Sequence, residues 1–412
     1  MELPKVLKVR QVLPTECIQD VPGEVRQALA GANLKGRVKP GSRVAITAGS
    51  RGISEIVTVL RTVVEEVKAA GAEPFIVPTM GSHGGAMAEG QIGVLAEYGI
   101  TEQTMGCPIR SSMETVVLGT TPSGAHVHMD KNAYGADATI VVARVKAHTG
   151  FKAPIESGMC KMMTIGLGKH AGALSTHAHG LGETIPDYAR TVIEKGNIVL
   201  GVPLVENAFH KLCRIEAVAP DRIHETDRRL LQLSNSHLPR VPFDHLHVLI
   251  VDTMGKNISG SGMDYNVIGI WRRIGGERQP WYERIVVLDV TPESEGNCVG
   301  MGMADFTTRR LFDKVDMHKT YTNVLTASNT IEGLLSGKIP IVMESDRKAV
   351  EAALNSVTLD GAPLRLVRIH STLHLDEFHA TEALLPEIEA NPQLQVAGEA
   401  TPMQFDPSGN FV

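Results

Sequence analysis

The sequence predicts an α/β fold of two domains with mainly parallel sheets and an active site in the cleft between them. Its 412 residues suffice for two or three domains that each bury a core. Short β-branched runs alternate with helical patterns, which is the order of βαβ units. Turn formers and two prolines over residues 234–242 indicate a boundary near the middle. We therefore expect an N-terminal domain over residues 1–240 and a C-terminal domain over residues 241–412.

The first half of the chain contains four candidate strands, at residues 43–47, 74–78, 139–143 and 198–202. Between the first two, residues 53–70 place apolar side chains at three-to-four spacing before Gly71, which predicts an amphipathic helix. A shorter helix is expected over residues 89–98.

The second half repeats this alternation. Strands are expected at residues 247–251, 284–289, 340–343 and 364–368. Helices are expected near residues 305–316 and 347–354, with Asp305 as the N-cap of the first.

Composition argues against several classes of partner. The chain has 40 Lys+Arg against 46 Asp+Glu, and no basic run appears, so we expect no nucleic-acid or membrane partner. Five scattered cysteines without a C-x-x-C pair are typical of reduced thiols. Because the N-terminus lacks a signal-peptide pattern and no apolar run approaches ~18 residues, we expect a cytoplasmic protein.

Two histidines follow predicted strands, where open α/β sheets bind their ligands. His83 lies between glycines after the strand at 74–78, and His148 follows the strand at 139–143. Histidine takes or gives a proton near neutral pH, so two of them can serve opposite faces of one carbon. The alternative for His83 is a solvent-exposed turn residue.

The segment from Glu156 to His170 is the densest in reactive side chains. Lys161 stands among Met, Cys and Ile, where a buried ammonium is costly unless it is paired or covalently used. Alternatively, this lysine extends its charge to solvent from a loop edge. His177 and His179 are two residues apart, so one of them can bind a metal while the other lies at the surface.

Two loops suit anions. Ser50 and Arg51 precede a predicted helix, although neither a Walker A loop nor a G-x-G-x-x-G motif is present, which argues against nucleotide hydrolysis and ordinary NAD binding. A glycine-rich loop over residues 252–264 brings Lys256 and backbone amides together. A flexible turn with a surface lysine is the alternative for this second loop.

Several of these motifs, in this order, resemble the nickel-pincer lactate racemases and their uncharacterised relatives. The resemblance lies in the segments Gly81–His83, His148 with Gly150, Ser157–Lys161, Ile165–Gly166 and His177. It covers about the first half of the chain. It implies a lactate-racemase-like cofactor-binding domain followed by a C-terminal domain that closes on the substrate.

The resemblance implies a set of roles and an isomerase activity. Lys161 would carry a nickel-pincer pyridinium mononucleotide through a thioamide, with nickel also bound by His177; His179 and His170 stay open as alternatives. His83 and His148 would be the acid/base pair as hydride leaves a 2-hydroxy acid and returns to its other face. The remaining implied contacts are Arg51, Ser50 and Gly158 with the cofactor, and Lys256, Asn257 and Arg272 with the substrate.

Two departures from the family pattern concern the substrate. Ala48 and Gly49 stand where the family usually carries an aspartate, and residues 151–156 lengthen the interval between His148 and Lys161. We therefore expect a racemase or epimerase of a 2-hydroxy acid, including larger acids and sugar acids.

The expected partners are this small-molecule substrate and cofactor-synthesis proteins, and a homo-oligomer stays open. The alternatives are a lyase, hydratase or hydrolase on the same fold that uses a plain divalent metal, and a non-catalytic ligand-binding protein.

Overall fold

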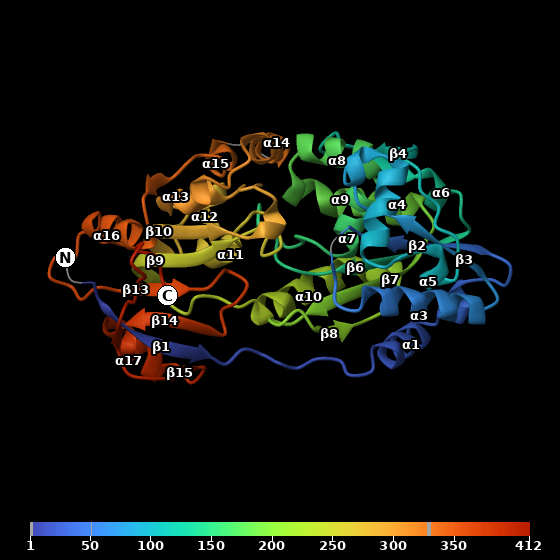
Figure 1. Ribbon diagram of the computed structural model, residues 1–412. Helices are drawn as coiled ribbons and strands as arrows, with labels where there is room; N and C mark the ends of the chain where they lie inside the picture. The colour runs from blue at the N-terminus through green and yellow to red at the C-terminus, as the bar shows by residue number, and fades with distance from the viewer. Residues whose placement is uncertain (1–2, 51, 328–330) are drawn as a thin grey trace. The chain divides into compact units, whose positions relative to one another are not determined.

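The computed structural model describes residues 3–50, 52–327 and 331–412 (Figure 1). The chain divides into two compact units, residues 14–238 and residues 1–13 with 239–412, which we call the N-terminal and C-terminal units. Each unit combines helices with a sheet, which is mainly parallel in the N-terminal unit and mixed in the C-terminal unit. The predicted fold class of two α/β domains is confirmed.

The N-terminal unit is built on a five-stranded sheet in the order β3-β2-β6-β7-β8. The strands are β2 Arg43–Ala48, β3 Glu73–Pro78, β6 Ala138–Arg144, β7 Ile198–Glu206 and β8 Leu212–Ile215. All neighbours pair in parallel except β7 and β8. The chain runs from β2 outward to β3 and later returns to β6 on the other side of β2, so the loops after β2 and β6 diverge. Such a switch point is where open α/β sheets bind ligands.

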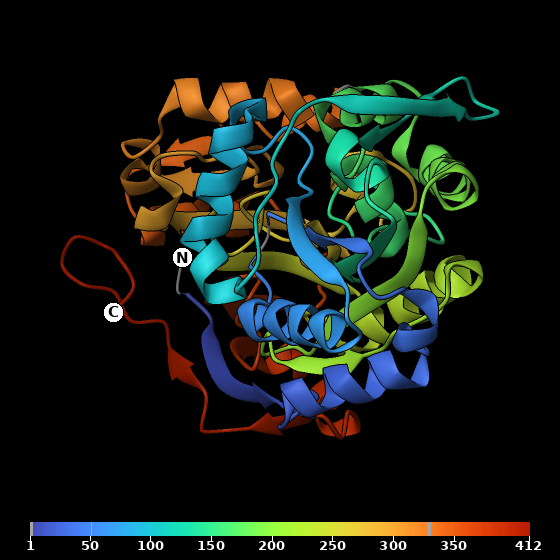
Figure 2. The same ribbon diagram turned by 90° about the vertical axis from the view of Figure 1, so that its right-hand side faces the viewer.

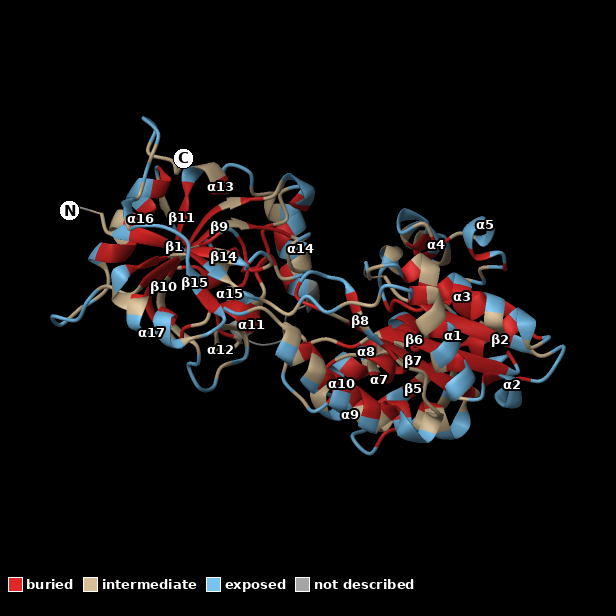
Figure 3. Cartoon of the chain, turned by 90° about the horizontal axis from the view of Figure 1, so that it is seen from below, coloured by how far each residue is buried: buried red, intermediate tan, exposed pale blue. Residues whose placement is uncertain are grey.

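Helices cover both faces of this sheet, whose strands are mostly buried (Figure 3). Apolar side chains of α1 Val21–Gly31 and α3 Ile56–Ala69 pack on one face. The other face carries α7 Met159–Lys161, the π-helical turn η2 Met162–Gly166 and α9 Leu181–Lys195. The remaining elements are α2 Leu34–Arg37, α4 Ala88–Glu97, α5 Glu102–Met105, α6 Lys131–Tyr134, α8 Lys169–Ala178, α10 Ile223–His237, the 3-10 turns η1 Gly84–Ala86 and η3 Pro220–Arg222, and the hairpin strands β4 Thr115–Thr120 and β5 His126–Asp130.

The C-terminal unit contains a nine-stranded mixed sheet, in the order β12-β11-β10-β9-β13-β14-β1-β15 with β16 beside β1. Strands β12 to β13 pair in parallel, and the β14, β1 and β15 pairings are antiparallel. The strands are β1 Lys5–Gln11, β9 His245–Met254, β10 Trp281–Val290, β11 Phe306–Thr308, β12 Ile341–Met343, β13 Leu366–Ile369, β14 Glu377–Thr381, β15 Leu394–Val396 and β16 Thr401–Pro402. The helices are α11 Tyr265–Ile268, α12 Trp271–Ile274, α13 Arg309–Phe312, α14 Met317–Ala327, α15 Ile331–Leu335, α16 Asp346–Asn355 and α17 Leu385–Ala390, with the 3-10 turns η4 Pro292–Ser294, η5 Met301–Met303 and η6 Glu382–Leu384.

The position of the N-terminal strand β1 does not fit the expected division of the chain at residue 240. It lies between β14 and β15 in the C-terminal sheet, where the blue strand runs beside red ones (Figure 2). Residues 1–13 therefore belong with the C-terminal unit. The expected boundary segment also begins later than predicted, because Ser234–His237 form the last turn of α10 and the units divide between Leu238 and Pro239.

The helix predicted to begin at Asp305 was placed too early. Residues Phe306–Thr308 form the short strand β11 instead, and the Asp305 carboxylate accepts the backbone N–H of Ile285 at 2.7 Å. Thr308 caps the following helix by accepting the N–H of Leu311 at 3.1 Å. Pairing with β10 and β12 therefore overrode the local capping signal.

Two features bear on the protein's environment. All five cysteines have free thiols. In the described part of the chain, no helix combines the length and apolarity needed to cross a membrane.

Candidate functional site

Two loops at the carboxyl edge of the N-terminal sheet meet through Ser50 and His83. Ser50 follows β2 and His83 follows β3, and the Ser50 Oγ lies 2.6 Å from His83 Nδ1. The hydroxyl of Tyr98 donates to the Ser50 carbonyl at 3.2 Å and so contacts the first loop. The structure thus brings together two residues that the sequence placed in separate roles.

His148 lies in the loop after β6, and its ring is held from two sides. The backbone N–H of Gly150 donates to Nδ1 at 3.0 Å, which orients the imidazole. The ring also packs on Phe151, with 4.4 Å between centroids. The same phenyl ring lies 5.8 Å from the Lys161 ammonium, so His148 and Lys161 share one aromatic neighbour.

The buried carboxylate of Glu156 organises this loop. It accepts the backbone N–H of His148 at 2.7 Å and that of Ala153 at 3.3 Å, and it pairs with Lys152 at 3.3 Å. Only 4% of the Glu156 side chain is exposed, so these donors supply its partners in place of water. The segment that lengthens the interval between His148 and Lys161 is therefore an ordered structure rather than a loose insertion.

Lys161 ends α7, a short helix whose first turn is fixed by Asp227 of α10. The Asp227 carboxylate accepts the N–H groups of Met159 at 3.1 Å and Cys160 at 2.8 Å. Gly158 is required before this turn, because it has φ +85° and a Cβ there would lie 2.3 Å from Asp227 Oδ1. Gly158 thus has a backbone role in presenting Lys161.

Electrostatics links Lys161 to both His148 and His177. The pKa of His148 is well below its usual value, first because the ring is buried and then because of Lys161, with further lowering from Lys146, His177 and Lys152. The pKa of His177 is also lowered, by burial and then by Lys161. Side chains from three segments therefore converge, and both imidazoles are neutral at neutral pH with a lone pair available.

The other two histidines considered for a metal differ from His177. Helix α8 ends at Ala178, and His179 Nδ1 lies 2.7 Å from the carbonyl oxygen of Ser175, so this ring caps the helix end. His170, at the start of the same helix, is exposed, as are His177 and His179. His177 lies on the last turn, and its pKa is lowered by burial and then by Lys161.

The first two loops pack on the segment that follows Lys161. A Cβ at Gly49 would lie 3.1 Å from Met162 Cε, and one at Gly81 would lie 3.0 Å from Ile165 Cγ2. The loops that carry Ser50 and His83 therefore contact the turn directly after Lys161.

Arg51, expected to bind an anion, lies outside the described residues. The residues after it are anchored by Arg144 and Glu206, which form a largely buried ion pair at 2.5 Å. Arg144 donates to the Gly52 carbonyl at 3.1 Å, and Glu206 accepts the N–H of Ser54 at 2.8 Å. The ends of β6 and β7 thus hold this loop at the sheet edge.

Lys256 and Asn257 lie in the C-terminal unit, just beyond the carboxyl end of β9. The Lys256 ammonium donates to Asn323 Oδ1 at 2.7 Å and to the Gly260 carbonyl at 2.5 Å. Asn257 accepts a hydrogen bond from the Thr291 hydroxyl at 2.7 Å. Both residues are thus part of a polar cluster at one sheet edge.

Arg272 has a structural role in the same unit. Its guanidinium donates to the carbonyls of Tyr282 at 2.5 Å and Met303 at 3.4 Å, and it stacks on Trp271 at 4.7 Å. Burial lowers its pKa. Two of its guanidinium nitrogens thus donate to carbonyls of its own unit, which favours a structural role over the expected contact with the substrate.

One trio of possible metal ligands lies close together among the described residues, at His245, His247 and Glu283. His245 Nε2 lies 3.0 Å from a Glu283 oxygen, while His247 Nε2 lies 4.0 Å from it. The backbone N–H of Arg365 donates to His247 Nδ1 at 3.0 Å, which places the proton of the neutral ring on Nε2. The trio is therefore better explained as a hydrogen-bonded group than as a metal site.

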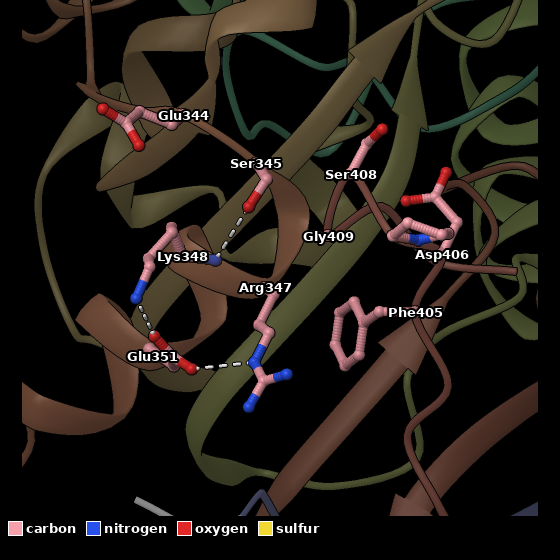
Figure 4. Close-up of a pocket in the computed structure, with 10 residues that line it drawn as sticks. Glu344, Ser345, Arg347, Lys348, Glu351, Phe405, Asp406, Ser408 and Gly409 are labelled. Carbon is pink, nitrogen blue, oxygen red and sulfur yellow. Dashed lines mark hydrogen bonds and ion pairs between the residues drawn. The ribbon is translucent and has the colours of Figure 1, made fainter.

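A surface hollow in the C-terminal unit lies beside the start of α16 and the segment 405–409 (Figure 4). Its charges are largely paired with one another, since Glu351 contacts Arg347 at 3.0 Å and Lys348 at 2.8 Å. None of the residues predicted from the sequence lines it.

Sequence reasoning missed Asp227, Glu156 as a loop organiser, and a buried pair of Lys169 with Asp130. Asp227 and the Lys169–Asp130 pair act on groups far away in the sequence, so no local motif marks them. Glu156 acts on residues three to eight positions before it, within an irregular loop that has no motif of its own. The only sign of the buried pair in the sequence was Lys169 itself, which directly follows Gly168.

Comparisons with known proteins give limited matches. Residues 48–212 match the family model described as Domain of unknown function (DUF362). No curated protein matches the chain. Among solved structures, 9 chains match. One is the lactate racemase apoprotein from Thermoanaerobacterium thermosaccharolyticum, with 14% identity, a TM-score of 0.48, and coverage of 81% of this chain and 84% of that one.

Proposed function

We propose that the protein is an isomerase, a racemase or epimerase of a 2-hydroxy acid that works through a nickel-pincer nucleotide attached to Lys161. The observation that carries this proposal is the convergence on Lys161, which shares Phe151 as an aromatic neighbour with His148. After burial, the Lys161 charge is the next cause that lowers the pKa values of His148 and His177. A primary amine and two neutral imidazoles, at the carboxyl edge of an α/β sheet, are the groups that a tethered metal cofactor and proton transfer require.

The residues present fit this cofactor by the chemistry of their donors. Lys161 is only half-buried, so its amine is available for a covalent bond. His177 is neutral and offers an imidazole nitrogen, a ligand that suits nickel. Ser50 and Gly158 lie in loops beside the Lys161 segment. When bound, the pincer nucleotide supplies a carbon that accepts and returns hydride.

His83 and His148 then exchange a proton with the substrate hydroxyl, one on each face of the reacting carbon. Ser50 holds the first ring, and Gly150 with Phe151 holds the second. Fixed rings matter because a proton moves over hydrogen-bond distances only. The neutral state of His148 favours its action as a base.

The substrate is an anionic hydroxy acid, and the ordered loop of residues 151–156 favours acids larger than lactate, such as sugar acids. Lys152, which is held by Glu156 and partly exposed, places a charged group in the loop beside His148 that can meet additional hydroxyls. Lys256 and Asn257 are the proposed carboxylate ligands from the C-terminal unit, and Arg51 is a proposed contact of the cofactor phosphate.

The test is co-expression of the chain with cofactor-synthesis proteins, followed by intact mass and nickel analysis. We expect an adduct on the wild-type protein with stoichiometric nickel, and loss of optical purity for one or more acids in a panel of 2-hydroxy acids. Lys161→Arg should carry no adduct, whereas Lys35→Arg, at an exposed position, should carry the full adduct. An unmodified wild-type chain beside active synthesis proteins would refute the proposal and favour a plain-metal enzyme or a binding protein.

A further inference from the structure

Lys169 is the one lysine with a fully buried side chain among the described residues. Its ammonium pairs with the buried carboxylate of Asp130 at 3.1 Å. It also donates to the carbonyl of Pro78, at the end of β3, and at 3.2 Å to Oε1 of Gln91. The ammonium therefore has one ion-pair partner and two hydrogen-bond acceptors.

Gln91 connects Lys169 to the loop that carries His83, because its side-chain amide hydrogen-bonds to both. It lies on α4 and is fully buried, and its Nε2 donates to the carbonyls of Gly81 at 2.9 Å and His83 at 3.3 Å. The amide orientation is fixed, because its oxygen faces an obligate donor and its nitrogen faces two obligate acceptors. Gln91 thus joins the Lys169 charge to the backbone on both sides of Ser82.

The position of Lys169 connects two parts of the proposed site. It follows Lys161 by eight residues and begins α8, the helix that ends beside His177. Its φ of +54° is rare for a side chain with a Cβ, so the surrounding contacts must hold it there. The contacts run from this segment through Gln91 to the His83 loop.

Stability alone is a poor explanation for this arrangement. Replacing a buried ion pair by apolar side chains of similar size is often neutral or stabilising, because charges lose their hydration on burial. Here the lysine and the glutamine donate to loop carbonyls at the base of a glycine-rich turn. What the network specifies is the path of the loop.

We propose that Lys169 and Gln91 are positioning residues that hold the loop of residues 79–83 so that the His83 ring stays on Ser50. Asp130 neutralises the lysine and keeps it in place. The effect on ring position follows from the contacts alone. Its consequence for catalysis rests on the proposed function, in which His83 transfers a proton.

The first test uses the full chain without cofactor. Protein with ¹⁵N-labelled histidine rings is examined by NMR. The signals of His83 are assigned by their loss in the variant His83→Gln. The variant Ser50→Ala then gives the spectrum of the His83 ring without its hydroxyl partner. We expect Gln91→Leu to shift the His83 Nδ1 resonance by at least half of the change caused by Ser50→Ala.

The matched control is Leu95→Ala, because Leu95 is also fully buried on α4 but lies outside the network. It should lower the melting temperature at least as much as Gln91→Leu and leave the His83 signals unchanged. Unchanged signals in Gln91→Leu, or equal shifts in the two variants, would overturn the proposal. If Gln91→Leu does not fold, the double variant Lys169→Met with Asp130→Asn serves as the second test with the same criteria.

A kinetic readout separates this proposal from the proposed function. In protein that carries the adduct, Gln91→Leu should lower kcat by about 10- to 100-fold with little change in KM, since a misplaced acid/base group weakens the transition state and not substrate binding. Because the NMR result needs no cofactor, a protein without racemase activity leaves it valid. A shifted His83 ring with unchanged kcat would instead remove the catalytic consequence.

Discussion

Replacing Asp227 by asparagine should change how the stability of the Lys161 segment depends on pH. This carboxyl is fully buried, and burial raises its pKa to about 7 even though the N–H groups of Met159 and Cys160 lower it. Its pKa in the unfolded chain is near 3.8. The folded state therefore keeps a proton that the unfolded state has lost between these two values.

The sign and size of the effect follow from this difference. Asp227 contributes its full stability below about pH 4, and that contribution falls as the pH rises to about 7 and then levels off. With the two pKa values of 3.8 and about 7, the local folding constant falls about 50-fold between pH 5 and pH 7, or about 2.3 kcal/mol. Asparagine has no proton to lose, so this slope disappears in the variant.

Hydrogen exchange of the peptide covering residues 159–167, corrected for intrinsic rates, measures this local stability. We expect the ratio of wild-type to Asp227→Asn protection to fall about 50-fold from pH 5 to pH 7. Titration of His148 and His177 occurs in both proteins and cancels in the ratio. Asp221→Asn, which removes an exposed carboxyl near the start of the same helix, should leave the ratio to wild type flat. A ratio for Asp227→Asn that changes less than about threefold would refute the reasoning.

Three further predictions concern the proposed site. His83→Ala and His148→Ala should each lower the racemisation rate of adduct-bearing protein by about 10²–10⁴, measured by polarimetry or chiral chromatography, and effects within twofold would remove them from the acid/base pair. Glu156→Gln loses an acceptor for the His148 N–H or the Lys152 ammonium, so kcat should fall with only a small change in melting temperature, and an unchanged kcat would count against its role. His177→Ala should lose nickel but keep the adduct mass, whereas His179→Ala should keep both; the reverse result would exchange their assignments.

The sequence predicted the strands at the centre of both sheets well, because continuous β-branched runs such as residues 43–47 and 284–289 appear within longer observed strands. It did not predict that β1 joins the C-terminal sheet, since its partners β14 and β15 lie more than three hundred residues away. The Asp305 prediction failed for a related reason. The local pattern favoured a helix that begins at Asp305, but residues 306–308 pair with strands β10 and β12 instead.

The site itself followed from strand-end positions, whereas its supports did not. Parallel strands gather their carboxyl ends at one edge, so Ser50, His83 and His148 were predictable as edge residues. Arg272 and Lys256 looked alike in the sequence, and both donate to groups of their own unit in the structure. Burial of Arg272, which lowers its pKa, favours a structural role for it.

The two lysines of the central segment show why burial cannot be inferred from apolar neighbours. Lys161 stands among Met, Cys and Ile, yet the turn directs Met159, Cys160 and Met163 into the core while Lys161 lies half-buried at the edge. Lys169 stands among glycines and is the buried one, because Asp130 and Gln91 come to it from distant elements. Residues adjacent in the sequence of a helix lie on different faces of it. A lysine is therefore buried only when its own face packs against the core, whatever its sequence neighbours are. The half-buried amine of Lys161 is the one proposed to carry the cofactor, and the buried amine of Lys169 is the one proposed to hold the loop that carries His83.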